Sequence, residues 1–147
     1  MGLFFAYSSS YDIRAEKLRS FVMPKGKAKT PALKYFKLSE FDCSVSGEND
    51  MKPDFLLMLD ALRDECGFSF TITSGYRSPT KHPIETAKAK PGTHAQGIAA
   101  DIATTDAHQR FVIVSNAIKL GFQGIGVARS FIHVDSRTSK PRVWSYS

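Results

Sequence analysis

The stretch THAQGIAADI (residues 93–102) holds a histidine and an aspartate, His94 and Asp101, seven residues apart. Residues 97–104 read as a strand, so Asp101 lies on this strand and His94 lies just before it. Imidazole and carboxylate groups are both metal ligands, and the small side chains around Asp101 leave room for a close approach. The spacing is also compatible with a simple hydrogen-bonded surface histidine, so further residues are needed to decide.

Two amphipathic helices flank this strand along the chain. Residues 51–67 have Pro53 in the first turn and Gly67 as a stop signal. Apolar residues follow the i, i+3/i+4 spacing of a buried helix face, namely Phe55, Leu56, Leu59 and Leu62. Residues 106–121 predict a second helix that ends at Gly121.

The remaining segments predict strands and one long connection. Residues 68–74 alternate and are rich in β-formers, and residues 122–128 and 130–136 form a closing pair of strands. Residues 75–92 are a long connection with one helical turn, and a loop of this length in a compact domain is commonly functional. This order predicts an α+β fold with a small, mostly antiparallel sheet flanked by helices.

Composition predicts one globular domain with a basic surface. The chain has 147 residues, 42% of them hydrophobic, a net charge of +6 and a pI near 9.4. Residues 1–33 are expected to form a weakly structured arm, and residues 34–147 the domain. No apolar run reaches the length of a membrane span. Cys43 and Cys66 do not make a disulfide framework, and we interpret them as ordinary thiols.

A third candidate ligand lies in the predicted last strand. In FIHVD the period of two puts His133 and Asp135 on one face, and Ile132 and Val134 on the other. Two histidines and one carboxylate are the ligand set of a zinc ion that keeps a fourth position open for water. A site without cysteine ligands is more typical of catalysis than of structure.

The segment SGYRSP (residues 74–79) adds an arginine at the end of a strand. Gly75 permits a tight turn, and Arg77 can grip a carboxylate or an oxyanion with two parallel hydrogen bonds. Tyr76 is adjacent to it. The alternative is a turn with a solvent-exposed arginine, and His82 and His108 are expected to be solvated.

Three blocks in this order resemble the zinc D-Ala-D-Ala carboxypeptidase family of peptidoglycan peptidases, which has the hedgehog/DD-peptidase fold. The blocks are SGYRSP, THAQGIAADI and GIGVARSFIHVD, and the resemblance extends over residues 36–144. It implies that His94, Asp101 and His133 bind Zn²⁺. It also implies that Arg77, with Ser74 and Tyr76, contacts the substrate.

One position departs from the pattern of this family. Many members carry a catalytic glutamate three residues before the last histidine, where this chain has Ser130. Asp135 is the candidate catalytic carboxylate in its place, and alternatively it orients His133 from behind. Glu85 and His82 are weaker candidates for the base.

The expected function is hydrolysis of peptidoglycan stem or cross-link peptides by a zinc-dependent carboxypeptidase or endopeptidase that acts as a monomer. The alternative is a non-catalytic virion or wall-binding protein that keeps the zinc site. The basic residues raise nucleic-acid binding as a third idea, but no recognised motif supports a specific nucleic-acid partner. The opening MGLFFAYSSSYDI is a poor signal peptide, so we expect cytoplasmic synthesis and access to the cell wall through lysis or a virion, as in a phage-encoded protein.

Overall fold

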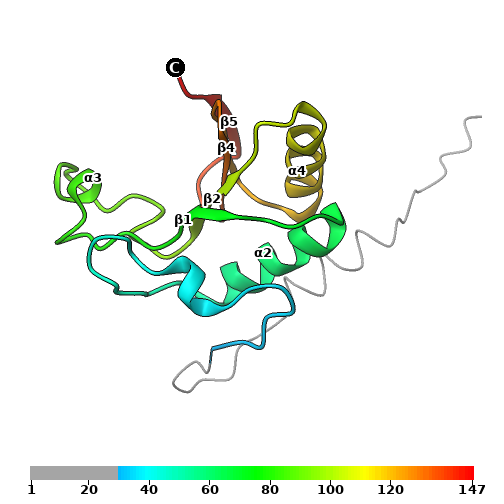
Figure 1. Cartoon of the computed structure of the whole chain (residues 1–147). Helices are drawn as coiled ribbons and strands as arrows, with labels where there is room; N and C mark the ends of the chain where they lie inside the picture. Colours follow the sequence, from blue (N-terminus) through cyan, green and yellow to red (C-terminus); the bar gives the residue numbers. More distant parts are fainter. Residues whose placement is uncertain (1–29) are drawn as a thin grey trace, which may run out of the picture.

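The computed structural model describes residues 30–147, so the predicted arm lies outside the described residues except for its last four. The chain has the predicted α+β composition (Figure 1). Its helical elements are η1 (Leu38–Phe41), α2 (Pro53–Cys66), α3 (Pro83–Thr86) and α4 (Ala107–Leu120). Its strands are β1 (Ile72–Ser74), β2 (Ala99–Ala103), β3 (Gly124–Val127), β4 (Phe131–Asp135) and β5 (Arg142–Ser145).

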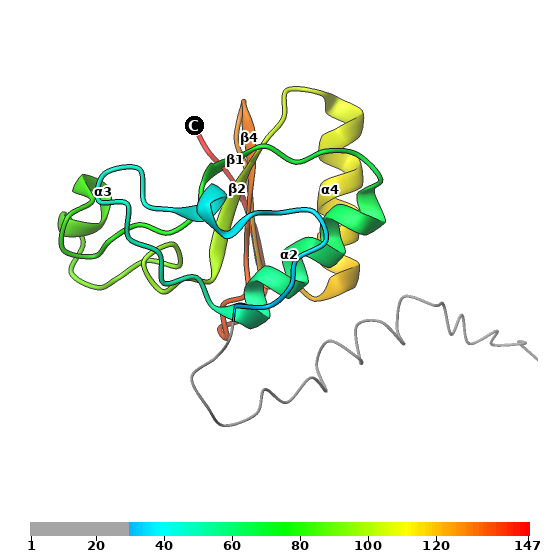
Figure 2. The ribbon, with the colours of Figure 1, turned by 60° about the horizontal axis from the view of Figure 1, so that its bottom comes forward.

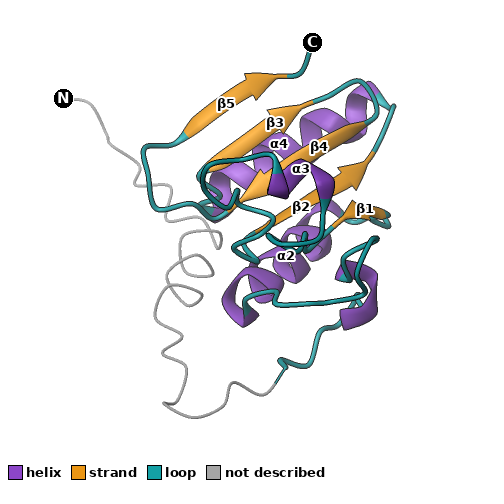
Figure 3. Cartoon of the chain, turned by 90° about the vertical axis from the view of Figure 1, so that its left-hand side faces the viewer, coloured by secondary structure: helices purple, strands orange, loops and turns teal. Residues whose placement is uncertain are grey.

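The five strands form one sheet in the order β1-β2-β4-β3-β5. Every neighbouring pair is antiparallel except β3 and β5, which run parallel, so the sheet is mostly antiparallel as predicted. Helices α2 and α4 cover one face, and α3 with its loop lies over the opposite side (Figures 2 and 3). The side covered by α3 is the one on which the polar site lies.

The hydrophobic core lies between the sheet and the two long helices. All four residues of the predicted stripe on α2 are buried, and Phe55 packs edge-on against Phe122 with ring centroids 6.1 Å apart. From the sheet, Ile102, Ile125, Ile132 and Val134 are almost fully buried in the same cluster. Since side chains alternate along a strand, the residues between them point to the other face, where the site lies.

Two elements differ from the sequence-based expectation. β1 is short, Ile72–Ser74, and its pairing with β2 is irregular between these two residues. Before it, Phe68 packs against Phe70, and Phe70 packs against Phe36. β5 was not predicted, because its four residues are mostly exposed and show no apolar alternation. None of the helices within residues 30–147 is long and apolar enough to cross a membrane.

Candidate metal centre

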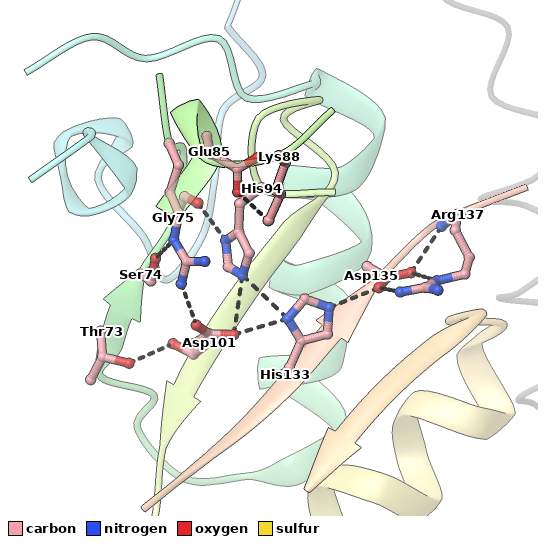
Figure 4. A network of polar contacts seen from close by, with 11 residues as sticks. Thr73, Ser74, Gly75, Glu85, Lys88, His94, Asp101, His133, Asp135 and Arg137 are labelled. Atoms are coloured by element: carbon pink, nitrogen blue, oxygen red, sulfur yellow. Dashed lines mark hydrogen bonds and ion pairs between the residues drawn. The ribbon is translucent and has the colours of Figure 1, made fainter. Parts of the chain in front are cut away.

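The three predicted ligands meet at one point of the sheet (Figure 4). Asp101 on β2 and His133 on β4 are direct cross-strand partners, and His94 reaches them from the loop before β2. The Nδ1 atom of His133 lies 3.0 Å from Oδ1 of Asp101 and 3.2 Å from Nε2 of His94, and this Nε2 lies 3.3 Å from the same Oδ1. All three side chains are buried.

The other ring nitrogen of each histidine is already occupied by a hydrogen-bond acceptor. Nδ1 of His94 donates to the carbonyl oxygen of Gly75 at 2.7 Å, and Nε2 of His133 donates to Asp135 at 2.7 Å. In the neutral rings the lone pairs of the remaining nitrogens therefore face each other and the carboxylate of Asp101. Three acceptors at this separation require a cation between them, which is either a shared proton or a metal ion.

The donor set fits zinc. With Zn–N and Zn–O distances of 2.0–2.2 Å, ligand atoms at the corners of a tetrahedron lie about 3.3 Å apart. The three separations of 3.0–3.3 Å in this cluster are close to that value. Two imidazoles and one carboxylate, without a cysteine, leave one corner for water or substrate, which is the pattern of a catalytic site.

The electrostatics of the cluster favour a positive charge at the same point. Burial opposes ionisation of Asp101, but hydrogen bonds from His133 and His94 outweigh burial and hold the pKa of this carboxyl well below its usual range. Burial likewise disfavours the charged form of His133. Its hydrogen bonds to Asp101 and Asp135 nevertheless raise the pKa of this imidazole. A metal ion would replace the proton that these two carboxylates attract.

Arg77 holds Asp101 from the side opposite to His133. Its guanidinium donates to Oδ2 of Asp101 at 3.1 Å and to the hydroxyl of Ser74 at 2.9 Å. This leaves Oδ1 of Asp101 directed at the histidines, and Arg77 also lines the cavity beside them. Ser74 therefore helps to position the guanidinium of Arg77. Tyr76 is buried in the hydrophobic core and is not among the residues that line this cavity.

Asp135 lies behind His133, with no exposed surface. It accepts two side-chain hydrogen bonds from Arg137, at 2.8 and 2.5 Å, and one from the backbone amide of the same residue. Burial opposes its ionisation, but the bonds from Arg137 and His133 hold the pKa of the Asp135 carboxyl well below its usual range. Asp135 does not line the cavity, so its contacts support the orienting role. Arg137 was missed in the sequence, where only its nearness to Asp135 hinted at a partner.

A cavity of about 590 Å³ opens over the three ligands. The loop side supplies Arg77, Ile84, Lys88, Thr93 and Gln96, and the strand side supplies Phe131, Arg137, Trp144 and Tyr146. The weaker candidates for the base do not line it. Glu85 is buried and holds Lys88 and the amide of Gly92, and the ring of His82 accepts the amide of Ile84 at the start of α3. His108 is exposed, as expected, and Ser130 lies exposed in the turn between β3 and β4.

Two of the three ligands, Asp101 and His133, belong to a row of paired residues that crosses the whole sheet. Neighbouring strands pair Ser74 with Asp101, Asp101 with His133, His133 with Gly126, and Gly126 with Trp144. Residues directly opposite each other on paired strands share a face of the sheet. One face of all five strands thus carries the site.

The fold and the site together define a candidate metallohydrolase, in which a buried His-Asp-His set lies at the floor of a cavity. Comparison with known families gives the same answer. Residues 34–135 match the family described as Peptidase M15, and the chain belongs to this family. M15 peptidases are zinc-dependent, in agreement with the donor set. A search of curated proteins gave no match.

Proposed function

We propose that this protein is a zinc-dependent peptidase that hydrolyses the stem or cross-link peptides of peptidoglycan. The observation that carries the proposal is the convergence of Nε2 of His94, Nδ1 of His133 and Oδ1 of Asp101 on one buried point beneath a cavity. Membership of the M15 family supports peptide hydrolysis at this point.

His94, Asp101 and His133 would hold the zinc ion. When bound, zinc supplies an activated water molecule and polarises the scissile carbonyl. The backbone carbonyl of Gly75 and the carboxylate of Asp135 keep the two imidazoles in the tautomers that present a lone pair to the site.

Arg77 is placed to act on the substrate as well as on Asp101. Its side chain is only 16% exposed, and two of its donor groups are used by Ser74 and Asp101. The remaining N–H groups of the guanidinium are available on the cavity side, where they can donate to a substrate carboxylate or to the developing oxyanion.

The charge of the protein supports an acidic peptide as substrate. Lys88 and Arg77 lie on the loop side of the cavity, and the whole chain has a net charge of +6. Peptidoglycan stem peptides are rich in carboxylates, so a protein with a basic net charge attracts them. The products of the reaction would distinguish a carboxypeptidase, which removes a terminal residue, from an endopeptidase, which cuts within the peptide.

Digestion of purified peptidoglycan tests the proposal. We expect the zinc-loaded protein to release muropeptides whose masses, read by mass spectrometry, identify the bond. The His94→Ala variant should release none, because it lacks one of three ligands. Zinc binding without cleavage by the wild type would instead favour the non-catalytic wall-binding protein, for which the exposed Ser130 at the usual glutamate position is the motivating observation.

The role of Asp135 can be separated from that of a general base with the Asp135→Asn variant. If Asp135 orients His133, its loss should weaken zinc binding by roughly 10–100-fold, and excess zinc should restore activity. If Asp135 is the general base, its loss should lower kcat by roughly 10²–10⁴-fold even at saturating zinc. We expect the first result, measured by zinc titration and by peptide hydrolysis across zinc concentrations.

Asp106→Asn is the matched control for this experiment. Asp106 is the N-cap of α4, accepts the amide of Gln109 at 2.7 Å and does not line the cavity. Asparagine caps helices nearly as well as aspartate. This variant should therefore bind zinc and hydrolyse peptides like the wild type.

A further inference from the structure

The C-terminal strand brings two aromatic side chains to the metal centre from outside the family match. The match ends at residue 135, whereas Trp144 on β5 and Tyr146 just after it line the cavity. The neighbouring Val143 is 59% exposed and belongs to the alternate set of side chains along β5. The two aromatic residues therefore share the face that carries the site.

Gly126 provides the space that these rings occupy. It stands between His133 and Trp144 in the row across the sheet. A Cβ atom at position 126 would lie 2.7 Å from Cε2 of Tyr146 and 2.8 Å from two atoms of the Trp144 indole. The missing side chain thus lets both rings lie over β3 and reach the centre.

Trp144 and Tyr146 have different surroundings. The Trp144 ring contacts His133, with ring centroids 5.3 Å apart, and the guanidinium of Arg137, 5.0 Å from the indole centroid. Trp144 therefore braces residues that are already part of the site. Tyr146 packs against Phe131 with ring centroids 5.2 Å apart and remains 44% exposed, so its ring is accessible to a ligand.

The two sides of the cavity thus differ in chemistry. Arg77 and Lys88, paired with Asp101 and Glu85, place cationic donor groups on the loop side, whereas Phe131 and Tyr146 make the strand side aromatic. A ligand that satisfies both has a carboxylate on one flank and an apolar C–H surface on the other. The stem peptides of the proposed function, which combine carboxylates with small aliphatic side chains, have this character.

We propose that Phe131 and Tyr146, braced by Trp144, form an aromatic platform that binds the apolar flank of the substrate peptide and so contributes to substrate selection. This inference rests on the proposed function for the identity of the ligand. The platform acts through the face of the Tyr146 ring rather than through its hydroxyl group. It lies beside the zinc ligands and contributes to substrate binding rather than to the chemical step.

Binding can be measured without turnover, because Trp144 is the single tryptophan of the chain and lies in the platform. Soluble muropeptides purified from peptidoglycan are titrated into the zinc-loaded protein, and tryptophan fluorescence is read immediately after mixing. We expect a saturable change whose apparent Kd rises at least about tenfold in Tyr146→Ala, because an aromatic contact surface is lost. Tyr146→Phe should stay within about twofold of the wild type.

Val143→Ala on the same strand is the matched control and should leave the Kd and the zinc content unchanged. If the protein cleaves peptidoglycan, Tyr146→Ala should raise KM and leave kcat nearly constant. A wild-type protein that binds muropeptides without cleaving them would overturn the peptidase and leave the platform standing. Unchanged binding by zinc-loaded Tyr146→Ala, or an equal loss in Tyr146→Phe, would overturn the platform.

Discussion

Replacing Asp101 by asparagine is expected to abolish zinc binding and to lower peptide hydrolysis by at least ~10³-fold. Asp101 is the only anionic member of the ligand set, and both histidines lie within 3.3 Å of its Oδ1 atom. A bound metal stabilises the transition state by several kcal/mol, and each 1.36 kcal/mol corresponds to a factor of ten in rate. Asparagine keeps the shape of the side chain, so the loss would report on charge and ligation.

Thermal unfolding gives a second measurement of the same variant. A ligand at 100 times its Kd stabilises the folded state by about 2.7 kcal/mol, which for a domain of this size raises Tm by on the order of 10 °C. We expect this shift when zinc is added to the chelator-treated wild type, and no shift in Asp101→Asn. A variant that still binds zinc stoichiometrically and cleaves peptides would show that these three residues are not the metal centre.

Replacing Gly97 by alanine is expected to destabilise the fold by about 3 kcal/mol, because two costs coincide. The backbone of Gly97 has φ of +73°, where side chains are strained, and an added Cβ would lie 2.0 Å from the carbonyl oxygen of Asp50. The carbonyl of Gly97 also accepts the amide of Lys52 at 2.8 Å, so this contact joins the start of β2 to the start of α2. Urea unfolding of the zinc-free protein measures the effect.

Gly47→Ala separates the two costs. Gly47 has nearly the same φ, +70°, but nothing lies within 4 Å of a Cβ at that position. Its substitution should cost about 1 kcal/mol from backbone strain alone. Equal losses in the two variants would mean that the segment around Asp50 moves aside without cost, contrary to the tight packing described here.

The alternation of FIHVD was enough to predict which residues of β4 face the core and which face the site. Ile132 and Val134 are fully buried in the core, while His133 and Asp135 are hydrogen-bonded on the other face. The partnership of His133 with Asp101 was not visible in this alternation, since pairing between distant strands depends on the whole sheet. For this, the sequence had to be compared with a known family.

The C-terminal part of the site could not be predicted from local patterns. Trp144 lies on a strand with little burial, and its position over the site depends on a parallel pairing with β3 and on the missing side chain of Gly126. The small residues around Asp101 were expected to admit the metal. For Gly97 the close neighbour is instead the backbone of Asp50, a contact between segments that no local pattern reports.

The row of paired residues that crosses all five strands ties the chemistry of the protein to its folding. A shift of one residue in the pairing of β2 with β4 would turn Ile102 or Ile132 toward the site and a ligand toward the core. A misaligned sheet would therefore lose its core and its metal affinity together. Zinc would bind only a sheet that has already formed in the correct alignment. Its stabilising effect would therefore belong to the native state, and we expect it to act mainly by slowing unfolding.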